Sequence, residues 1–387
     1  MKTKFPINAF RDISTPFFYY DLDLLNTILS GVQQQARQLG YQLHYALKAN
    51  VNDSVLINIR EKGFGADCVS GNEILKAVET GFDPKSIVFA GVGKSDDEIR
   101  IGLQHHIHSF NCESLQELEV INHLAGEMNT QAAVLLRLNP NIDAHTHRYI
   151  TTGIEENKFG INLWELNQVL EKINSFNNLT LIGLHFHIGS QILDQSVFKG
   201  LCLRINEIQQ WFEERKIRIN HINVGGGLGV NYSDPDGNLP DFNTYFNIFK
   251  QFLELRPGQQ LHFEPGRALV AQSGSLISRV LYIKEGIKTR FAILDAGMTE
   301  LIRPALYQAV HKIQNLTSSG LPLTYDVVGP ICESSDCFGK AVILPQTQRG
   351  DLIAIRSTGA YGEVMSSSYN LRTKAKAYYS KDLLNHE

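Results

Sequence analysis

The chain has 387 residues, a formal net charge of −4 and 43% hydrophobic residues. Its length exceeds what one hydrophobic core usually supports, so two domains are expected. The acidic balance argues against a nucleic-acid-binding protein, and no apolar run approaches the ~20 residues that span a bilayer. The first residues lack the apolar core of a secretory signal. Five cysteines without paired spacing indicate reduced thiols, so we expect a cytoplasmic protein.

From residue 22, short β-rich runs alternate with longer segments of helical periodicity. The predicted strands lie in the runs QLHYALK, GADCVS, SIVFAG, IHSFNC, QAAVLLRLNP, LTLIGLHFHIGS, INHINVGGG and QQLHFEPGR. Eight such units over about 245 residues match the ~250 residues of a (β/α)8 barrel. An open doubly wound sheet is the alternative, but eight consecutive regular units favour closure. We therefore predict an α/β fold with a TIM-like barrel over residues 22–266.

The pattern of predicted secondary structure changes after residue 266. The runs ALVAQSGSLISRVLYIKEG, RFAILDAG and DLIAIRSTGAYG are typical of strands joined by turns. We predict a C-terminal β-rich domain, sandwich-like or barrel-like, over residues 267–387. Residues 1–21 are assigned to the same domain, because the segment FFYYDL (17–22) could add a strand to it.

Polar residues stand where the predicted barrel strands end, which is where such barrels place their active sites. They are Lys48, Asp67, Arg137, His185, His187, Ser190, Gly225, Gly226, Gly227, Glu264 and Arg267. A lone lysine in a barrel is more often a solvated rim charge. A desolvated Lys48, however, would be a nucleophilic amine suited to Schiff-base chemistry.

The glycine run NVGGGLG (223–229) follows the seventh strand. It could be a plain flexible turn, and it is no dinucleotide site because no helix follows it. Loops after the seventh and eighth strands of barrels often bind phosphate through backbone N–H groups. The run EPGR (264–267) could form the other half of such a site. Glu264 could simply pair with Arg267, or it could pair with the protonated ring nitrogen of a cofactor.

His185 and His187 raise a different possibility. On a strand they would point to the same face and, with Asp67, could bind a metal ion as in metallohydrolase barrels. That set lacks further ligands, so we predict no metal at this site. A histidine that stacks on a flat cofactor fits better.

Eight motifs occur in order along nearly the whole chain: YALKAN, GADCVSGNE, HFHIGSQ, NVGGGLG, EPGR, RPALY, GPICESSD and GAYG. Together they resemble the fold-type-III decarboxylases that depend on pyridoxal 5'-phosphate (PLP), the ornithine/diaminopimelate/arginine decarboxylase family. The resemblance implies that Lys48 forms a Schiff base with PLP, that His187 stacks on its ring and that Glu264 pairs with its pyridine nitrogen. The other cofactor contacts it implies are Asp67, Ser190, Gly225, Gly226, Gly227, Gly266, Arg267 and Tyr361.

The resemblance also implies a homodimer with active sites shared across the interface. Cys332 and Glu333 would then enter the site of the partner subunit, and Cys332 would be a candidate proton donor. The alternative for Cys332 is a small buried apolar residue. The loop 145–160 resembles the mobile loop of the family, and its charged, glycine-containing composition would permit a lid.

Within the family, the motifs are most similar to members that act on diaminopimelate. This implies decarboxylation of meso-2,6-diaminopimelate to L-lysine and CO2, the last step of lysine biosynthesis. Arg303 and Arg267 have the fork shape that suits the distal carboxylate of that substrate. Tyr307 and Tyr361 could add contacts, and either Glu333 or the serines of CESSD (332–336) could take the distal ammonium. For Arg303 the alternative is a surface salt bridge.

Two other classes stay open. A decarboxylase of the same fold could act on a D-amino acid, carboxynorspermidine, ornithine, lysine or arginine. A non-catalytic binding relative is the second, although the joint presence of Lys48, Glu264 and Cys332 argues against it.

Overall fold

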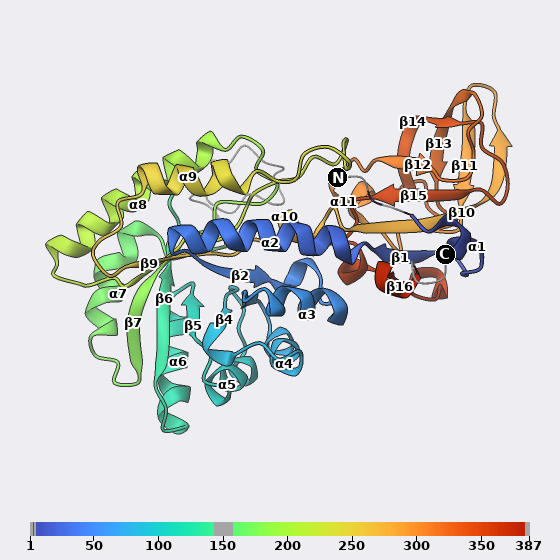
Figure 1. Ribbon diagram of the computed structural model, residues 1–387. Helices are drawn as coiled ribbons and strands as arrows, with labels where there is room; N and C mark the ends of the chain where they lie inside the picture. Colours follow the sequence, from blue (N-terminus) through green and yellow to red (C-terminus); the bar gives the residue numbers. More distant parts are fainter. Residues whose placement is uncertain (1–2, 4, 143–157, 384–387) are drawn as a thin grey trace. The chain divides into compact units, whose positions relative to one another are not determined.

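The computed structural model describes residues 3, 5–142 and 158–383 (Figure 1). Most of the loop 145–160 therefore lies outside the described residues. The contacts divide the chain into two compact units: a barrel unit (29–229 and 241–266) and a β-rich unit (1–28, 230–240 and 267–387). The domain boundaries expected at residues 22 and 266 stay predictions. The contacts differ from them by placing residues 22–28 and 230–240 with the β-rich unit.

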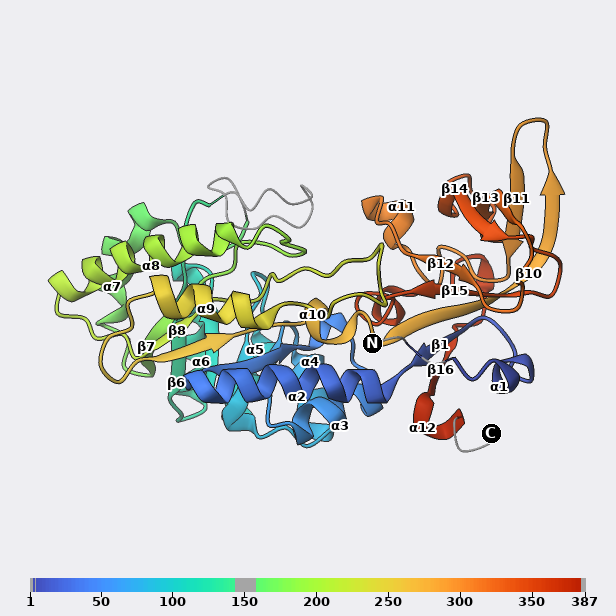
Figure 2. The same ribbon diagram turned by 45° about the horizontal axis from the view of Figure 1, so that its top comes forward.

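The barrel unit is a closed ring of eight parallel strands. Its strands are β2 Gln42–Ala46, β3 Gly65–Cys68, β4 Ile87–Phe89, β5 Ser109–Cys112, β6 Ala132–Arg137, β7 Leu179–His185, β8 His221–Asn223 and β9 Gln260–Phe263. Helices lie on the outside of this ring (Figures 1 and 2). They are α2 Leu22–Leu39, α3 Asp53–Glu61, α4 Gly71–Glu79, α5 Asp96–Gln104, α6 Leu115–Glu127, α7 Leu166–Ile173, α8 Ser196–Glu214 and α9 Phe242–Phe252. The predicted (β/α)8 barrel is confirmed.

Local sequence explains where these helices begin. The side chains of Asn52, Ser70 and Ser114 each accept a hydrogen bond from a backbone N–H in the first turn of the helix that follows. Such caps satisfy N–H groups that have no partner within the helix. The barrel helices then bury an apolar face, as Ile74 and Ala77 of α4 illustrate.

The interior of the barrel contains polar side chains as well as apolar ones. Buried polar residues on its strands or directly beside them include His44, Asp67, Asn111, Arg137, His185, Asn223, His262 and Glu264. Several of these side chains hydrogen-bond to one another, so the interior is not a uniform apolar core. The strand β7 ends at His185, so the prediction that His185 and His187 share one strand face is wrong.

The β-rich unit is a mixed eight-stranded sheet with the order β12-β15-β10-β11-β13-β14, to which β1 and β16 attach. Its strands are β1 Phe17–Tyr20, β10 Gly274–Glu285, β11 Arg290–Leu294, β12 Ile313–Asn315, β13 Pro322–Val328, β14 Cys337–Pro345, β15 Leu352–Arg356 and β16 Lys376–Tyr379. The short helices are α1 Ile7–Arg11, α10 Arg267–Val270, α11 Arg303–Tyr307 and α12 Ser380–Leu383.

The N-terminal segment belongs to this sheet, as expected. β1 pairs antiparallel with β10 and parallel with β16. Its side chains Phe17 and Tyr19 pack with Phe10, Ile277 and Leu352 in a buried cluster. This aromatic cluster explains why residues distant in sequence join one sheet. Within the described residues, no helix is both long and apolar enough to cross a membrane.

The barrel wall is tightly packed at Gly65 in β3. A Cβ atom there would lie 2.3 Å from the carbonyl oxygen of Ser86 and 2.6 Å from Nδ1 of His44. Gly65→Ala should therefore destabilise the protein by about 1–3 kcal/mol, the usual cost of overpacking. Urea denaturation measures this change.

Gly200 in α8 is the matched control, because a Cβ atom there meets nothing within 4 Å. Gly200→Ala should raise the free energy of unfolding by up to ~1 kcal/mol through helix propensity. Equal stability of the Gly65→Ala variant and the wild type would contradict the tight packing.

Candidate active site

Lys48 and Asp67 form an ion pair at the carboxyl ends of neighbouring strands. Lys48 lies in a 3-10 turn (Leu47–Ala49) directly after β2, and Asp67 lies on β3. The distance from Lys48 Nζ to Asp67 Oδ2 is 3.5 Å; the lysine side chain is 38% exposed and the aspartate side chain 1%. The amine is thus held by a buried carboxylate but stays accessible to a ligand.

Glu264 is a buried carboxylate held by three side chains from other strands. Its Oε1 accepts hydrogen bonds from the side-chain amides of Asn223 (2.7 Å) and Asn111 (3.2 Å). Its Oε2 lies 3.0 Å from Nε2 of His185. Asn111 and Asn223 were not among the predicted site residues. The feature of the sequence that could have indicated them is an amide side chain at an inward-facing position of a barrel strand.

The two buried carboxyl groups, Asp67 and Glu264, have pKa values that are shifted in opposite directions. Burial, and then the nearby Glu264 charge, raises the pKa of Asp67 well above its usual value, while Lys48 opposes this change. Burial would also raise the pKa of Glu264, but His185 and Lys48 hold it well below its usual value. Glu264 therefore stays ionised, and Asp67 is the group of the two that takes up a proton more readily.

His187 follows β7 and contacts the glycine run. Its Nδ1 accepts a hydrogen bond from the backbone N–H of Gly226 (3.3 Å), so this nitrogen carries no proton. Most of the imidazole surface is enclosed. That burial, with the charges of Lys48 and Arg137, lowers the pKa of His187 well below its usual value. The ring is a neutral aromatic plate at neutral pH.

The backbone of the glycine run lies very close to neighbouring atoms. Gly225 has φ +68°, and a Cβ atom on it would lie 2.6 Å from Nδ1 of His187. A Cβ atom on Gly226 would lie 2.3 Å from the carbonyl oxygen of Glu264. Side chains are excluded here, so an anion can approach the backbone of this loop closely. Gly227 completes the run, also with positive φ. The nearby predicted residues Ser190 and Gly266 also lie in loops of the barrel unit.

The β-rich unit contains a pair of buried guanidinium groups. Arg267 donates to Tyr232 Oη at 2.7 Å. The Arg303 guanidinium lies 4.7 Å from the centroid of the same Tyr232 ring. Arg303 is 4% exposed, so the alternative of a surface salt bridge is wrong. Among the described residues, no carboxylate forms an ion pair with Arg303.

A neutral histidine orients Arg303. His311 Nδ1 donates to the Arg356 carbonyl oxygen (2.8 Å), so its Nε2 is free to accept from Arg303 Nη1 (2.9 Å). Burial, and then the Arg303 charge, lowers the pKa of His311 to about 3. Burial also lowers the pKa of Arg303. A buried cation next to a neutral partner favours an anionic ligand.

Tyr361 and Tyr307 belong to the same unit. Tyr361 has φ +58°, a conformation that non-glycine residues adopt rarely and mostly at functional sites. Its ring lies under the Arg267 guanidinium at 4.8 Å. Tyr307 ends α11, the helix that Arg303 begins.

Cys332 and Glu333 lie between β13 and β14. Both are exposed, so the alternative of a buried apolar Cys332 is wrong. The Glu333 carboxylate accepts a hydrogen bond from the Ser335 hydroxyl at 3.1 Å. An exposed thiol beside a carboxylate has the accessibility that a proton donor requires.

The barrel residues fit a PLP group. Asp67 Oδ1 and His185 Nδ1 are buried and have no hydrogen-bond partner in the described part of the chain. An accessible lysine amine, an ionised Glu264, a neutral aromatic ring and an open glycine loop match the aldehyde, the ring nitrogen, the ring face and the phosphate of PLP.

Comparisons with known proteins show the family of the chain. A family model described as "Pyridoxal-dependent decarboxylase, pyridoxal binding domain" matches residues 25–271. A diaminopimelate decarboxylase of Bacteroides thetaiotaomicron is 57% identical over 386 residues, which cover 99% of this chain and 100% of that one. A diaminopimelate decarboxylase of Vibrio cholerae is 41% identical over 361 residues, which cover 93% and 86%.

Solved structures show the same likeness. The diaminopimelate decarboxylase of Helicobacter pylori, complexed with L-lysine, has a TM-score of 0.92 at 39% identity and covers 97% of this chain and 94% of that one. A lysine/ornithine decarboxylase from Vibrio vulnificus has a TM-score of 0.84 at 21% identity, which shows the fold alone. The predicted fold class and enzyme class are thereby confirmed. The chain belongs to the family of pyridoxal-dependent decarboxylases and, within it, to the diaminopimelate decarboxylases.

Proposed function

We propose that the protein removes CO2 from meso-2,6-diaminopimelate and releases L-lysine, with PLP as its cofactor. The observation that supports this most is the buried, ionised Glu264 with its donors Asn111, Asn223 and His185. A carboxylate kept charged in a barrel interior needs a cationic partner, and a protonated pyridine nitrogen is such a partner.

Residues of the barrel unit would make most of the contacts to the cofactor. Lys48 would bind its aldehyde carbon, the loop from Gly225 to Gly227 and Ser190 its phosphate, and His187 its ring face. Arg267, Tyr361 and Gly266 would complete the contacts. When bound, PLP supplies an electron sink for the electron pair of the broken carbon–carbon bond.

The protein groups would supply charge and proton control. Glu264 would keep the ring nitrogen protonated, because its own pKa is held low. Asp67 would keep the Lys48 amine close to the cofactor and could take or return a proton, since its pKa is raised. His187 would offer an uncharged surface that does not compete for the electron pair.

Arg303 would select the substrate. Diaminopimelate has a distal carboxylate, which ornithine, lysine and arginine lack. A buried guanidinium with a neutral His311 beside it stabilises that carboxylate and disfavours a distal ammonium alone. Tyr307, Tyr361 and Arg267 would add contacts.

We further propose a cytoplasmic homodimer. Cys332 and Glu333 would serve the active site of the partner subunit, with Cys332 as a proton donor and Glu333 as the partner of the distal ammonium. Their exposure in a single chain supports this role.

Lys48→Ala should abolish turnover, because no other described amine pairs with Asp67. Release of CO2 and lysine from meso-diaminopimelate measures turnover, and the visible absorption of the purified protein reports the lysine–cofactor imine. Lys85→Ala, which changes an exposed lysine, is the control and should keep both signals. Normal activity in the Lys48→Ala variant would refute the assignment.

Glu264→Gln should lower kcat by about a hundredfold or more, the scale of losing one preorganised charge interaction. The amide still accepts from Asn223 but lacks the charge for a pyridinium. Steady-state kinetics give kcat, and equilibrium dialysis gives PLP occupancy. Glu285→Gln on the exposed end of β10 is the control. An unchanged kcat with full PLP occupancy would remove Glu264 from the reaction.

Arg303→Ala should raise KM for diaminopimelate about 10- to 100-fold, since a hydrogen-bonded charge contributes ~1.5–3 kcal/mol. Arg349→Ala, an exposed arginine of the same unit, should leave KM unchanged. A panel of D-amino acids, ornithine, lysine and arginine tests the substrate class in parallel. If the wild type prefers one of these to diaminopimelate, the substrate assignment fails while the PLP chemistry stands.

A further inference from the structure

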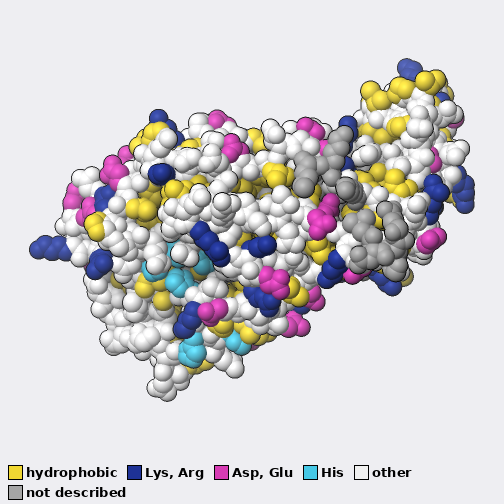
Figure 3. Space-filling model, viewed as in Figure 1, with side chains coloured by type: hydrophobic (Ala, Val, Ile, Leu, Met, Phe, Trp, Pro, Cys, Tyr) yellow, Lys and Arg dark blue, Asp and Glu magenta, His cyan; other side chains and the backbone are white. Residues whose placement is uncertain are grey.

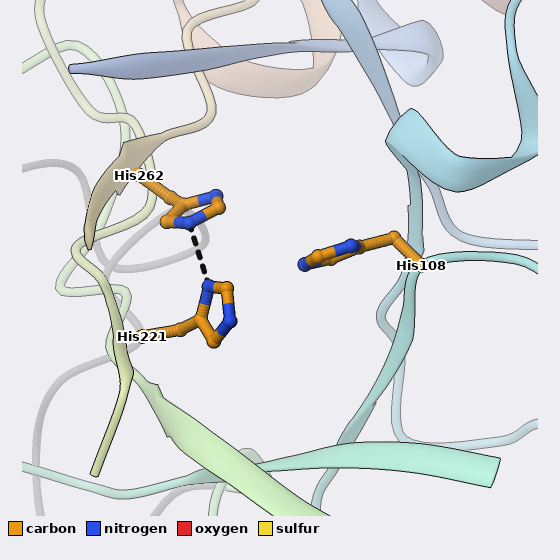
Figure 4. Close-up of side chains that lie close together, drawn as sticks. All are labelled: His108, His221 and His262. Atoms are coloured by element: carbon orange, nitrogen blue, oxygen red, sulfur yellow. Dashed lines mark hydrogen bonds between the residues drawn. The ribbon is translucent and has the colours of Figure 1, made fainter. Parts of the chain in front are cut away.

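Four histidines gather inside the barrel toward the amino-terminal ends of its strands, away from the candidate active site. His44 lies on β2, His108 directly precedes β5, His221 begins β8 and His262 lies on β9. Figure 4 shows three of them, His108, His221 and His262, with their rings turned toward a common point. The rings of His44 and His262 stack with centroids 5.2 Å apart. No step of the proposed reaction uses this cluster.

The hydrogen bonds fix the protons of three rings. The Ser86 carbonyl oxygen can only accept, so His44 Nδ1, 3.0 Å away, must donate. His44 Nε2 then accepts from His262 Nδ1 (2.9 Å), and His262 Nε2 accepts from His221 Nδ1 (2.9 Å). This order leaves His221 Nε2 unprotonated. Burial lowers the pKa of His44 and of His221 to about 4, so these hydrogen-bonded histidine rings are neutral at physiological pH.

One ring nitrogen of His108 makes no hydrogen bond to the described residues. Its Nε2 is buried and has no hydrogen-bond partner in the part of the chain that the structure describes. The ring lies edge-on to His221 at 5.2 Å and stacks with His262 at 5.8 Å. Burial lowers the pKa of His108 as well. A buried ring nitrogen without a partner costs ~1–3 kcal/mol unless a ligand fills the space.

The ring nitrogens are spaced almost as metal ligands. One nitrogen from each of His108, His221 and His262 lies within 4.8 Å of the other two. Zinc–nitrogen distances of ~2.0–2.1 Å in a tetrahedron require nitrogens ~3.3 Å apart. The rings would have to close by up to about 1.5 Å, and the His221–His262 hydrogen bond would be exchanged for two metal–nitrogen bonds. His108 and His221 are half-buried and His262 is buried. Figure 3 shows histidine side chains at the surface of the molecule and does not distinguish the cluster from the other histidines.

We propose that His108, His221 and His262 form a binding site for one divalent transition-metal ion of the zinc class at the amino-terminal end of the barrel. Three imidazoles without a carboxylate favour Zn²⁺, Ni²⁺ or Cu²⁺ over Mg²⁺ or Ca²⁺. Water completes the coordination. His44 is a positioning residue: it accepts from Nδ1 of His262 and so turns the lone pair of Nε2 toward the ion. The site differs from the pair His185 and His187 considered from the sequence.

Two charges act on this site from its surroundings. Glu264 favours a cation at His262 and His44, as its effect on both histidines shows. The exposed Lys85 beside His108 opposes a cation. Removal of the Lys85 charge should therefore strengthen metal binding without any change in the buried rings.

The experiment uses the PLP-loaded enzyme after chelator treatment and dialysis. Added Co²⁺ should bind with a stoichiometry of one per chain and give the visible d–d bands of a tetrahedral site, and Zn²⁺ should displace it. His108→Ala and His221→Ala should lose this signal. His44→Gln should keep the stoichiometry but weaken affinity by about 10–100-fold, the usual effect of an outer-shell partner. Lys85→Gln should bind more tightly.

The controls separate this site from other ligands. His123→Ala changes an exposed histidine of α6, and Cys332→Ser removes the exposed thiol; both should bind Co²⁺ like the wild type. Absence of a tetrahedral signal in the wild type would overturn the proposal, as would an unchanged signal in the His108→Ala and His221→Ala variants. If those two variants fail to fold, unchanged affinity in both His44→Gln and Lys85→Gln overturns it instead.

Discussion

A carboxylate buried in a barrel stays ionised only if donors surround it, and Glu264 obtains its donors from three other strands. Asn111 comes from β5, His185 from β7 and Asn223 from β8. The hydrogen bonds to one carboxylate show that the closed ring brings these three residues to the same level of the interior. The loss of any one donor would leave charge unsolvated in a low-dielectric space. The proposed cofactor chemistry depends on this arrangement, since it keeps the cofactor nitrogen charged.

The barrel interior is layered by chemistry. Toward the carboxyl ends lie the ionisable pair Lys48 and Asp67 and the ionised Glu264. Toward the amino-terminal ends lie neutral histidines connected to one another by hydrogen bonds. His262 lies on β9, and Glu264 follows the end of that strand two residues later; both side chains are buried, so this short segment joins the two layers.

The β-rich unit contains a buried cation, the guanidinium group of Arg303. Arg303 has a neutral imidazole and an aromatic ring around it, and neither neutralises its charge. His311 can accept because its other nitrogen donates to a backbone carbonyl. A site of this kind is stable as a receptor for an anion, which agrees with a substrate that has two carboxylates.

The sequence alone determined the alternation of strands and helices, the polar residues at the strand ends and the order of motifs that resembles one family. These properties are local, because periodicity and turn formation depend on residues that are neighbours in the sequence. Only the tertiary structure decided which inward residues share a layer: that Asn111 and Asn223 bond Glu264, that His185 serves the same carboxylate, that His311 holds Arg303 and that four histidines meet. A period of two tells which face a strand residue takes, but the stagger of the closed barrel sets its height relative to other strands. That stagger is a property of the whole ring and is not present in any single strand.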